Sequence, residues 1–263
     1  MPALDATSDL IATTTAWGKG QPLDASLARI SAQTPAARVE ISIGARPVAD
    51  PRALLESLSD RFSYLAHHSA PILPGAFLRP ETHSPKEAVA ALRALGISRY
   101  TIHPPTKRRI ARVEDFYTWA WEWFDTLGEA GIDVRLETMY TPRDREETNV
   151  VGGYHLDSNK ATLDFCAAAR ARGIEIPLLI DLSHLFIGLH GQTWTNQDVL
   201  DMLTSDLSDH LHVSANDGRR DLHVPVPDAH PVMDWMTGNL DRFAYVVDEG
   251  RRDVPVSLLR ALA

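Results

Sequence analysis

The chain has 263 residues, of which 44% are hydrophobic and 23% are charged, with 15 glycines and 17 prolines. This composition is typical of a folded globular protein and excludes collagen, coiled coil and intrinsic disorder. No stretch approaches the roughly 18 consecutive apolar residues that a membrane-spanning helix needs, and the net charge of −9 provides no global positive field for nucleic acid or anionic membranes.

Short apolar or β-branched runs alternate with longer amphipathic stretches along the whole chain. This alternation is typical of repeated βα units around a parallel sheet. The predicted strands are residues 10–14, 39–43, 62–67, 100–103, 134–138, 178–183, 210–214 and 243–249. The predicted helices are residues 22–30, 51–58, 85–95, 114–127, 157–172 and 196–207. Eight such units in about 250 residues predict one (β/α)8 TIM barrel domain covering residues 1–263.

Local signals support these elements and the cellular compartment. In the helix predicted at 114–127, Phe116, Trp119, Trp123 and Leu127 fall at spacings of three and four, which predicts one buried face. The one cysteine, Cys166, lies in an apolar run and is expected to be a buried structural thiol. The first residues lack a basic region followed by an apolar stretch, which argues against a secretory signal and for a cytoplasmic protein.

Six consecutive predicted strands end in side chains that can bind a metal ion. In a βα barrel the catalytic groups gather at the C-terminal ends of the strands. These groups are His67 with His68, His103, Glu137, Asp181 with His184, His212, and Asp248 with Glu249, and the pair Asp221 and His223 follows the seventh strand. Each alone is explained by a hydrogen-bonded core residue, a helix cap or an ion pair. Together they would be costly to desolvate without a cation, so we expect a divalent metal site.

These residues also resemble a known group, the xylose isomerase-like TIM barrels, which include sugar isomerases, sugar epimerases and endonuclease IV. The resemblance runs from about the third strand to the end of the chain. It rests on Leu136-Glu137-Thr138, Ile180-Asp181-Leu182-Ser183-His184, Leu211-His212-Val213, residues 216–225 and Asp248-Glu249-Gly250. It implies that one metal binds to Glu137, Asp181, His212 and Glu249.

The eighth strand offers two candidates for the last of these ligands. An apolar residue precedes Glu137 and Asp181, and the same rule favours Asp248, which follows Val247. The family pattern of glutamate followed by glycine favours Glu249 instead, and this is the residue we predict.

The endonuclease IV branch binds three zinc ions, and each of its further ligands has a counterpart here. The resemblance implies that His67 and His103 bind the first zinc, that Glu137 bridges it to the second, and that the third has a separate set. That third set is His184, Asp221 and His223. Zinc is therefore the expected metal, with manganese, iron and cobalt as alternatives.

Two segments depart from endonuclease IV and argue against a DNA substrate. They are residues 138–143, after the bridging glutamate, and residues 69–74, where that family inserts residues into DNA. The basic clusters are small and are explained as solvated surface charge, although Lys107 and Arg219 flank ligand-bearing strands. We expect these two to bind a substrate phosphate or carboxylate. The loop at 138–156 is predicted to set substrate specificity, with a homodimer contact as its alternative role.

Two reactions suit this set of residues. The first is hydrolysis of a phosphoester by two or three metals, which activate water and stabilise the leaving oxygen, with Glu137 and Glu249 as the catalytic glutamates. The second is isomerisation or epimerisation of a keto-sugar or polyol on one metal, with a ligand glutamate moving the proton. Hydrolysis by a cluster requires His67 and His103, whereas in the second scheme they only line the pocket. A barrel that binds a metabolite without turnover is a third alternative.

Overall fold

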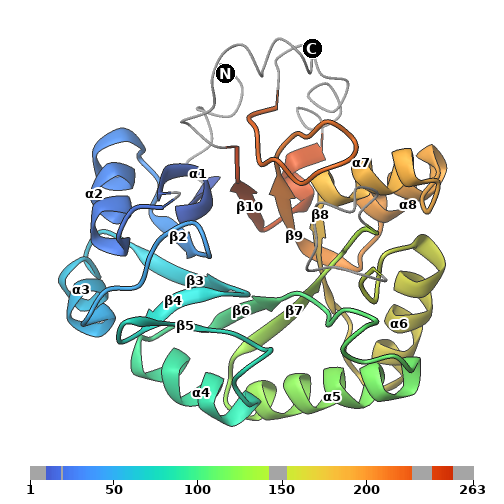
Figure 1. Cartoon of the computed structure of the whole chain (residues 1–263), viewed down its shortest axis with the longest axis horizontal. Helices are drawn as coiled ribbons and strands as arrows, with labels where there is room; N and C mark the ends of the chain where they lie inside the picture. Colours follow the sequence, from blue (N-terminus) through green and yellow to red (C-terminus); the bar gives the residue numbers. More distant parts are fainter. Residues whose placement is uncertain (1–9, 19, 142–152, 227–238, 251–263) are drawn as a thin grey trace.

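Eight parallel strands close into a barrel in the order β1-β10-β9-β8-β7-β6-β3-β2 (Figure 1). The structure is a computed structural model, and it describes residues 10–18, 20–141, 153–226 and 239–250. The barrel strands are β1 (Leu10–Thr13), β2 (Arg38–Ile41), β3 (Ser63–His67), β6 (Arg99–Ile102), β7 (Asp133–Glu137), β8 (Leu178–Asp181), β9 (Ser208–Val213) and β10 (Tyr245–Asp248). Each lies where the sequence predicts it, with ends shifted by at most two residues. The predicted (β/α)8 TIM barrel is confirmed.

Helices follow the strands and form the outer layer (Figure 1). They are α1 (Thr14–Gly18), α2 (Leu23–Gln33), α3 (Pro51–Ser57), α4 (Pro85–Ala94), α5 (Val113–Glu129), α6 (Asn159–Ala171), α7 (Leu182–Gly191) and α8 (Asn196–Thr204), with a 3-10 turn η1 (Leu240–Arg242). The six predicted helices are confirmed, while α1 and α7 were not predicted. Within the described ranges, no helix is long and apolar enough to cross a membrane.

Local capping explains where α4 begins and ends. Pro85 occupies the first turn, where its missing N–H costs nothing, and the Ser84 hydroxyl accepts a hydrogen bond from the Glu87 backbone. The Glu87 carboxylate accepts one in return from the Ser84 backbone at 2.7 Å. Gly96, at φ +67°, then supplies the left-handed residue that ends the helix.

An additional hairpin follows β3 and was not predicted. Its strands β4 (Ala70–Leu73) and β5 (Ala76–Leu78) pair antiparallel. Ile72 and Leu78 are buried, and the Gly75 N–H donates to the Val48 carbonyl at 2.8 Å. The segment that departs from endonuclease IV thus contributes to the core instead of forming an extended loop.

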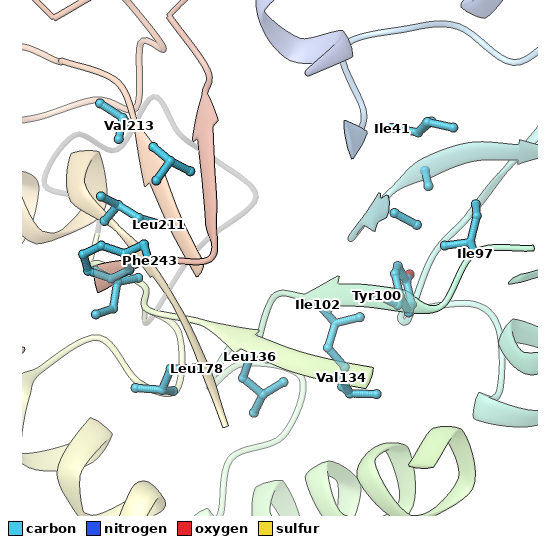
Figure 2. Packing of buried hydrophobic residues seen from close by; sticks show 14 of the residues in the cluster. Ile41, Ile97, Tyr100, Ile102, Val134, Leu136, Leu178, Leu211, Val213 and Phe243 are labelled. Atoms are coloured by element: carbon cyan, nitrogen blue, oxygen red, sulfur yellow. The ribbon is translucent and has the colours of Figure 1, made fainter. Parts of the chain in front are cut away.

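Side chains on the barrel strands alternate between the helix layer and the barrel interior. Figure 2 shows Val134 and Leu136 on the side of β7 that faces the helices. The main core lies in this outer layer and includes Phe116, Trp123 and Leu127 of α5, so the predicted buried face is confirmed. Cys166 is buried there too, and burial raises the pKa of its thiol to about 12.

The barrel interior contains few apolar side chains. Ile11, Leu65 and Val247 form a small separate cluster inside it. Many of the other inward positions carry polar or charged groups that are fully buried, and these include Glu40, Thr101, Asp181, His210 and His212. The barrel therefore encloses ionisable groups where a structural protein would place aliphatic ones.

Candidate metal centre

Strand alternation directs the predicted ligands toward the barrel axis. Leu136, Ile180 and Leu211 belong to the outer core, so the residue after each of them faces inward. These inward residues are Glu137, Asp181 and His212, with exposed fractions of 1%, 0% and 0%. All three predicted positions therefore meet inside the barrel.

On β10 the same alternation selects Glu249 over Asp248. Val246 packs in the outer core and Val247 in the inner cluster, so Glu249 points inward and is 1% exposed. Asp248 is half-buried and accepts a hydrogen bond from the Gly250 backbone at 2.9 Å. The rule that an apolar residue precedes the ligand fails here because Val247 itself faces inward.

The Glu137 carboxylate lies between two groups of histidines. Its Oε2 is 2.8 Å from His67 Nε2 and 2.7 Å from His103 Nε2. Its Oε1 faces the other way and lies 3.5 Å from His184 Nδ1 and 3.9 Å from His212 Nδ1. One carboxylate therefore touches two different donor sets, as a bridging ligand must.

His212 stands among the carboxylates of the second set. Its Nδ1 lies 3.2 Å from Glu249 Oε2 and 3.9 Å from Asp181 Oδ2. The opposite ring nitrogen, Nε2, lies 3.1 Å from Glu40 Oε2 on β2. Both edges of this buried ring are thus directed at carboxylates.

A third group lies beside the second and joins it. Asp221 Oδ2 is 3.4 Å from His184 Nε2 and 2.8 Å from His223 Nε2. His223 Nδ1 in turn lies 3.4 Å from Glu249 Oε2. The His184 Nδ1–H donates to the Thr138 carbonyl at 2.8 Å, which leaves Nε2 for the site. The nine predicted metal-binding residues thus form one connected network.

Several of these buried atoms are close to one another without hydrogen-bond geometry. Among the described residues, the atoms without a hydrogen-bond partner include His103 Nε2, Asp181 Oδ2, His212 Nδ1, His223 Nδ1 and both carboxylate oxygens of Glu249. Leaving so many polar atoms buried and unsatisfied is costly. A shared cation would satisfy them, so the residues fit a metal centre.

Donor atoms within 4.8 Å of one another form three groups in the described part of the chain. The groups are Glu40-His67-His212-Glu249, His67-His103-Glu137 and Glu137-Asp181-His184. They share members, so cations bound there would be neighbours in one cluster. Imidazole and carboxylate donors suit zinc, manganese, iron or cobalt.

The pKa values of these groups reflect the crowding of buried charge. Burial raises the pKa of Asp181 to about 7, and the nearby carboxylates of Glu137 and Glu249 add to the effect. Burial opposes a charged His184, but Asp181, Glu137 and Asp221 outweigh it and raise the pKa of His184 to about 10. Burial, together with His68, lowers the pKa of His103 to about 4. The lowered pKa favours a neutral His103, the form that binds a metal, whereas the carboxylates around His184 favour a positive charge that a bound cation would supply in place of the proton.

Comparisons with known proteins find solved structures with the same fold. No family model matches the chain, and no curated protein matches it in sequence. A D-tagatose 3-epimerase-like protein matches with a TM-score of 0.62 at 13% identity, over 97% of this chain and 96% of that one. An AP endonuclease, family 2, from Brucella melitensis matches with 0.61 at 14% identity, over 95% of each chain.

A xylose isomerase domain-containing protein from Salmonella typhimurium LT2 matches with a TM-score of 0.57 at 10% identity, over 97% of this chain and 94% of that one. The chain has the fold of the xylose isomerase-like TIM barrels. At these identities the likeness concerns the fold, and the sugar enzymes and the endonuclease share it.

In this barrel, the two predicted substrate-binding cations lie outside the donor network. The Lys107 ammonium is 2.7 Å from a carboxylate oxygen of the buried Asp157. Arg219 is exposed, and its backbone N–H donates to Asp217 at 2.9 Å. Both substrate-binding roles stay predictions. Of the loop at 138–156, residues 142–152 lie outside the described residues.

The structure also places residues beside the donor network for which the sequence predicts no role. His68 stacks on His103 with ring centroids 3.9 Å apart, and its Nε2 lies 3.0 Å from Glu81 Oε1. The ring of Tyr140 lies 4.7 Å from that of His184. Glu40 is also added. It lies inside the strand predicted at residues 39–43, whereas the predicted ligands stand at the ends of the third to eighth strands.

Proposed function

We propose that this protein is a metal-dependent hydrolase that cleaves phosphoesters with a cluster of two or three divalent cations. The position of Glu137 is the observation that carries the proposal. Its Oε2 contacts His67 and His103, while its Oε1 faces the second donor set. A centre for one metal would need only the second set, and it would not require two histidines to converge on the far oxygen of the same carboxylate.

Each proposed cation has its own donors in the network, with Glu137 shared by the first two. His67 and His103 would hold the first, Asp181, His212 and Glu249 the second, and His184, Asp221 and His223 the third. Bound cations of this kind supply an activated water near neutral pH and stabilise charge on a leaving oxygen. Zinc is the proposed metal, with manganese, iron and cobalt as alternatives.

The charge of the donor set links the number of cations to the charge of the substrate. The buried or half-buried carboxylates of the network are Glu40, Glu137, Asp181, Asp221 and Glu249. One divalent cation among five carboxylates leaves an excess of negative charge, which would repel a phosphate. Three divalent cations exceed that negative charge and would attract one, whereas two cations would leave one negative charge in excess. A phosphoester therefore suits a cluster of three cations, and a neutral sugar suits a single cation.

The second candidate is a sugar isomerase or epimerase with one metal on Glu137, Asp181, His212 and Glu249. The fold likeness to a D-tagatose 3-epimerase-like protein supports it, as the likeness to an AP endonuclease supports hydrolysis. In this scheme His67 and His103 line the pocket, and the contacts to Glu137 Oε2 have no catalytic role.

A paired substrate assay tests the choice between these functions. We expect purified protein to hydrolyse bis(p-nitrophenyl) phosphate, to lose this activity after dialysis against a chelator, and to regain it with added zinc. An oligonucleotide with an abasic site and the ketohexose D-fructose are assayed in parallel. Interconversion of the ketohexose without any phosphodiester cleavage would reject hydrolysis and support the one-metal scheme.

A further inference from the structure

We infer that Glu40 is a positioning residue that fixes the tautomer and orientation of the His212 ring for metal binding. The inference rests on the metal centre of the proposed function. Glu40 lies on β2, across the barrel from His212 in the strand order, and both side chains are 0% exposed. The His212 Nε2–H donates to Glu40 Oε2 at 3.1 Å.

The backbone of β2 directs Glu40 to this place. Val39 and Ile41 on either side belong to the outer core, so Glu40 faces the barrel interior. In the parallel pairing with β3, Glu40 is opposite Leu65, two residues before His67. Glu40 therefore lies one step deeper in the barrel than the ends of the strands, beneath the donor network.

A neutral His212 ring carries one N–H proton, either on Nδ1 or on Nε2. Nδ1 faces Glu249 Oε2 at 3.2 Å, Asp181 Oδ2 at 3.9 Å and Glu137 Oε1 at 3.9 Å. These three carboxylates would draw the proton to Nδ1 and remove the lone pair that a metal needs. Glu40 is the carboxylate on the opposite edge, and its hydrogen bond keeps the proton on Nε2.

The hydrogen bonding of the surrounding atoms supports a proton on Nε2 of His212. His212 Nδ1, Asp181 Oδ2, both Glu249 oxygens and Glu40 Oε1 have no hydrogen-bond partner among the described residues, whereas Glu40 Oε2 is bonded to His212 Nε2. A glutamate at a fully buried position of a barrel strand is costly, and a packing role alone would be better served by an aliphatic side chain. The hydrogen bond to a metal-binding histidine gives it a specific use, since such partners set the tautomer and the basicity of the ligand.

Metal affinity tests this inference without any assay of activity. We would compare Glu40→Leu, Glu40→Gln and the control Thr101→Val by competition of Zn²⁺ with a chromophoric chelator and by the visible spectrum of bound Co²⁺. Thr101 is also fully buried, and its hydroxyl has no hydrogen-bond partner among the described residues. We expect Glu40→Leu to bind about 10- to 100-fold more weakly and to shift the Co²⁺ spectrum. Glu40→Gln, which keeps an acceptor, should recover most of the affinity, and Thr101→Val should match wild type.

Wild-type affinity and an unchanged Co²⁺ spectrum in Glu40→Leu would overturn the inference. If that variant does not fold, nitrogen NMR of the zinc-loaded wild-type protein decides, because a proton on Nδ1 of His212 overturns the inference and a proton on Nε2 supports it. A wild-type protein that binds neither Zn²⁺ nor Co²⁺ would instead reject the metal centre itself. Failure of the inference about Glu40 is thus distinguishable from failure of the proposed metal centre.

Discussion

Glu137→Gln is expected to lower phosphoester hydrolysis by about 10³-fold and to reduce the metal content of the protein. The Glu137 carboxylate contacts both the His67 and His103 pair and the second donor set. Glutamine keeps the volume but removes the negative charge and one of the two acceptor oxygens. Steady-state hydrolysis and elemental analysis of the same preparation would measure both effects.

The matched control is Glu122→Gln, which makes the same chemical change at an exposed position of α5. We expect this variant to keep the wild-type rate and metal content. Circular dichroism would show that both variants are folded. Full activity or full metal content in Glu137→Gln would show that this carboxylate does not hold the cluster together.

Replacing both His67 and His103 with alanine is expected to abolish hydrolysis and to remove one metal per chain. These two nitrogens lie 2.8 and 2.7 Å from the same Glu137 oxygen. The second set keeps Asp181, His212 and Glu249, so a one-metal isomerase would retain much of its rate. The variant therefore separates the two proposed reactions.

His190→Ala provides the control for loss of a histidine outside the network. His190 is exposed at the end of α7, and its Nδ1 lies 3.0 Å from the Phe186 carbonyl. It should leave the rate and the metal count unchanged. A double variant at His67 and His103 that still hydrolyses phosphoesters at the wild-type rate would be incompatible with the cluster.

The barrel was predictable because each strand and helix carries its own local signal. Apolar runs such as Leu178–Asp181 marked the strands, and the prolines at 51 and 85 marked helix starts. The elements that escaped prediction lack such signals. Helix α7 begins immediately after β8, with the Asp181 side chain accepting from the His184 backbone, so no loop separates strand from helix. The hairpin β4–β5 is short and has proline in its first strand, a residue that weakens the sequence signal for a strand.

The metal-binding residues at strand ends were predictable for a different reason. Parallel strands bring their C-terminal ends to one face, so residues far apart in sequence must meet there. This rule does not predict a role for Glu40. That residue lies deeper in the barrel and contacts His212 only because the barrel closes. The rule also does not predict the stacking of His68 on His103. The His68 backbone is left-handed at φ +39°, and its ring stacks on that of His103. Such contacts depend on three-dimensional packing that no spacing in the sequence records.

The number of metals bound per chain separates a metal cluster from a centre for one metal. Freshly purified protein would be analysed for its elements, then again after mild chelation and readdition of zinc, manganese or cobalt. The connected donor network around Glu137 predicts two or three tightly bound metals per chain, with zinc as the expected element. A single exchangeable metal per chain would contradict the cluster and would make His67 and His103 pocket residues of a one-metal enzyme.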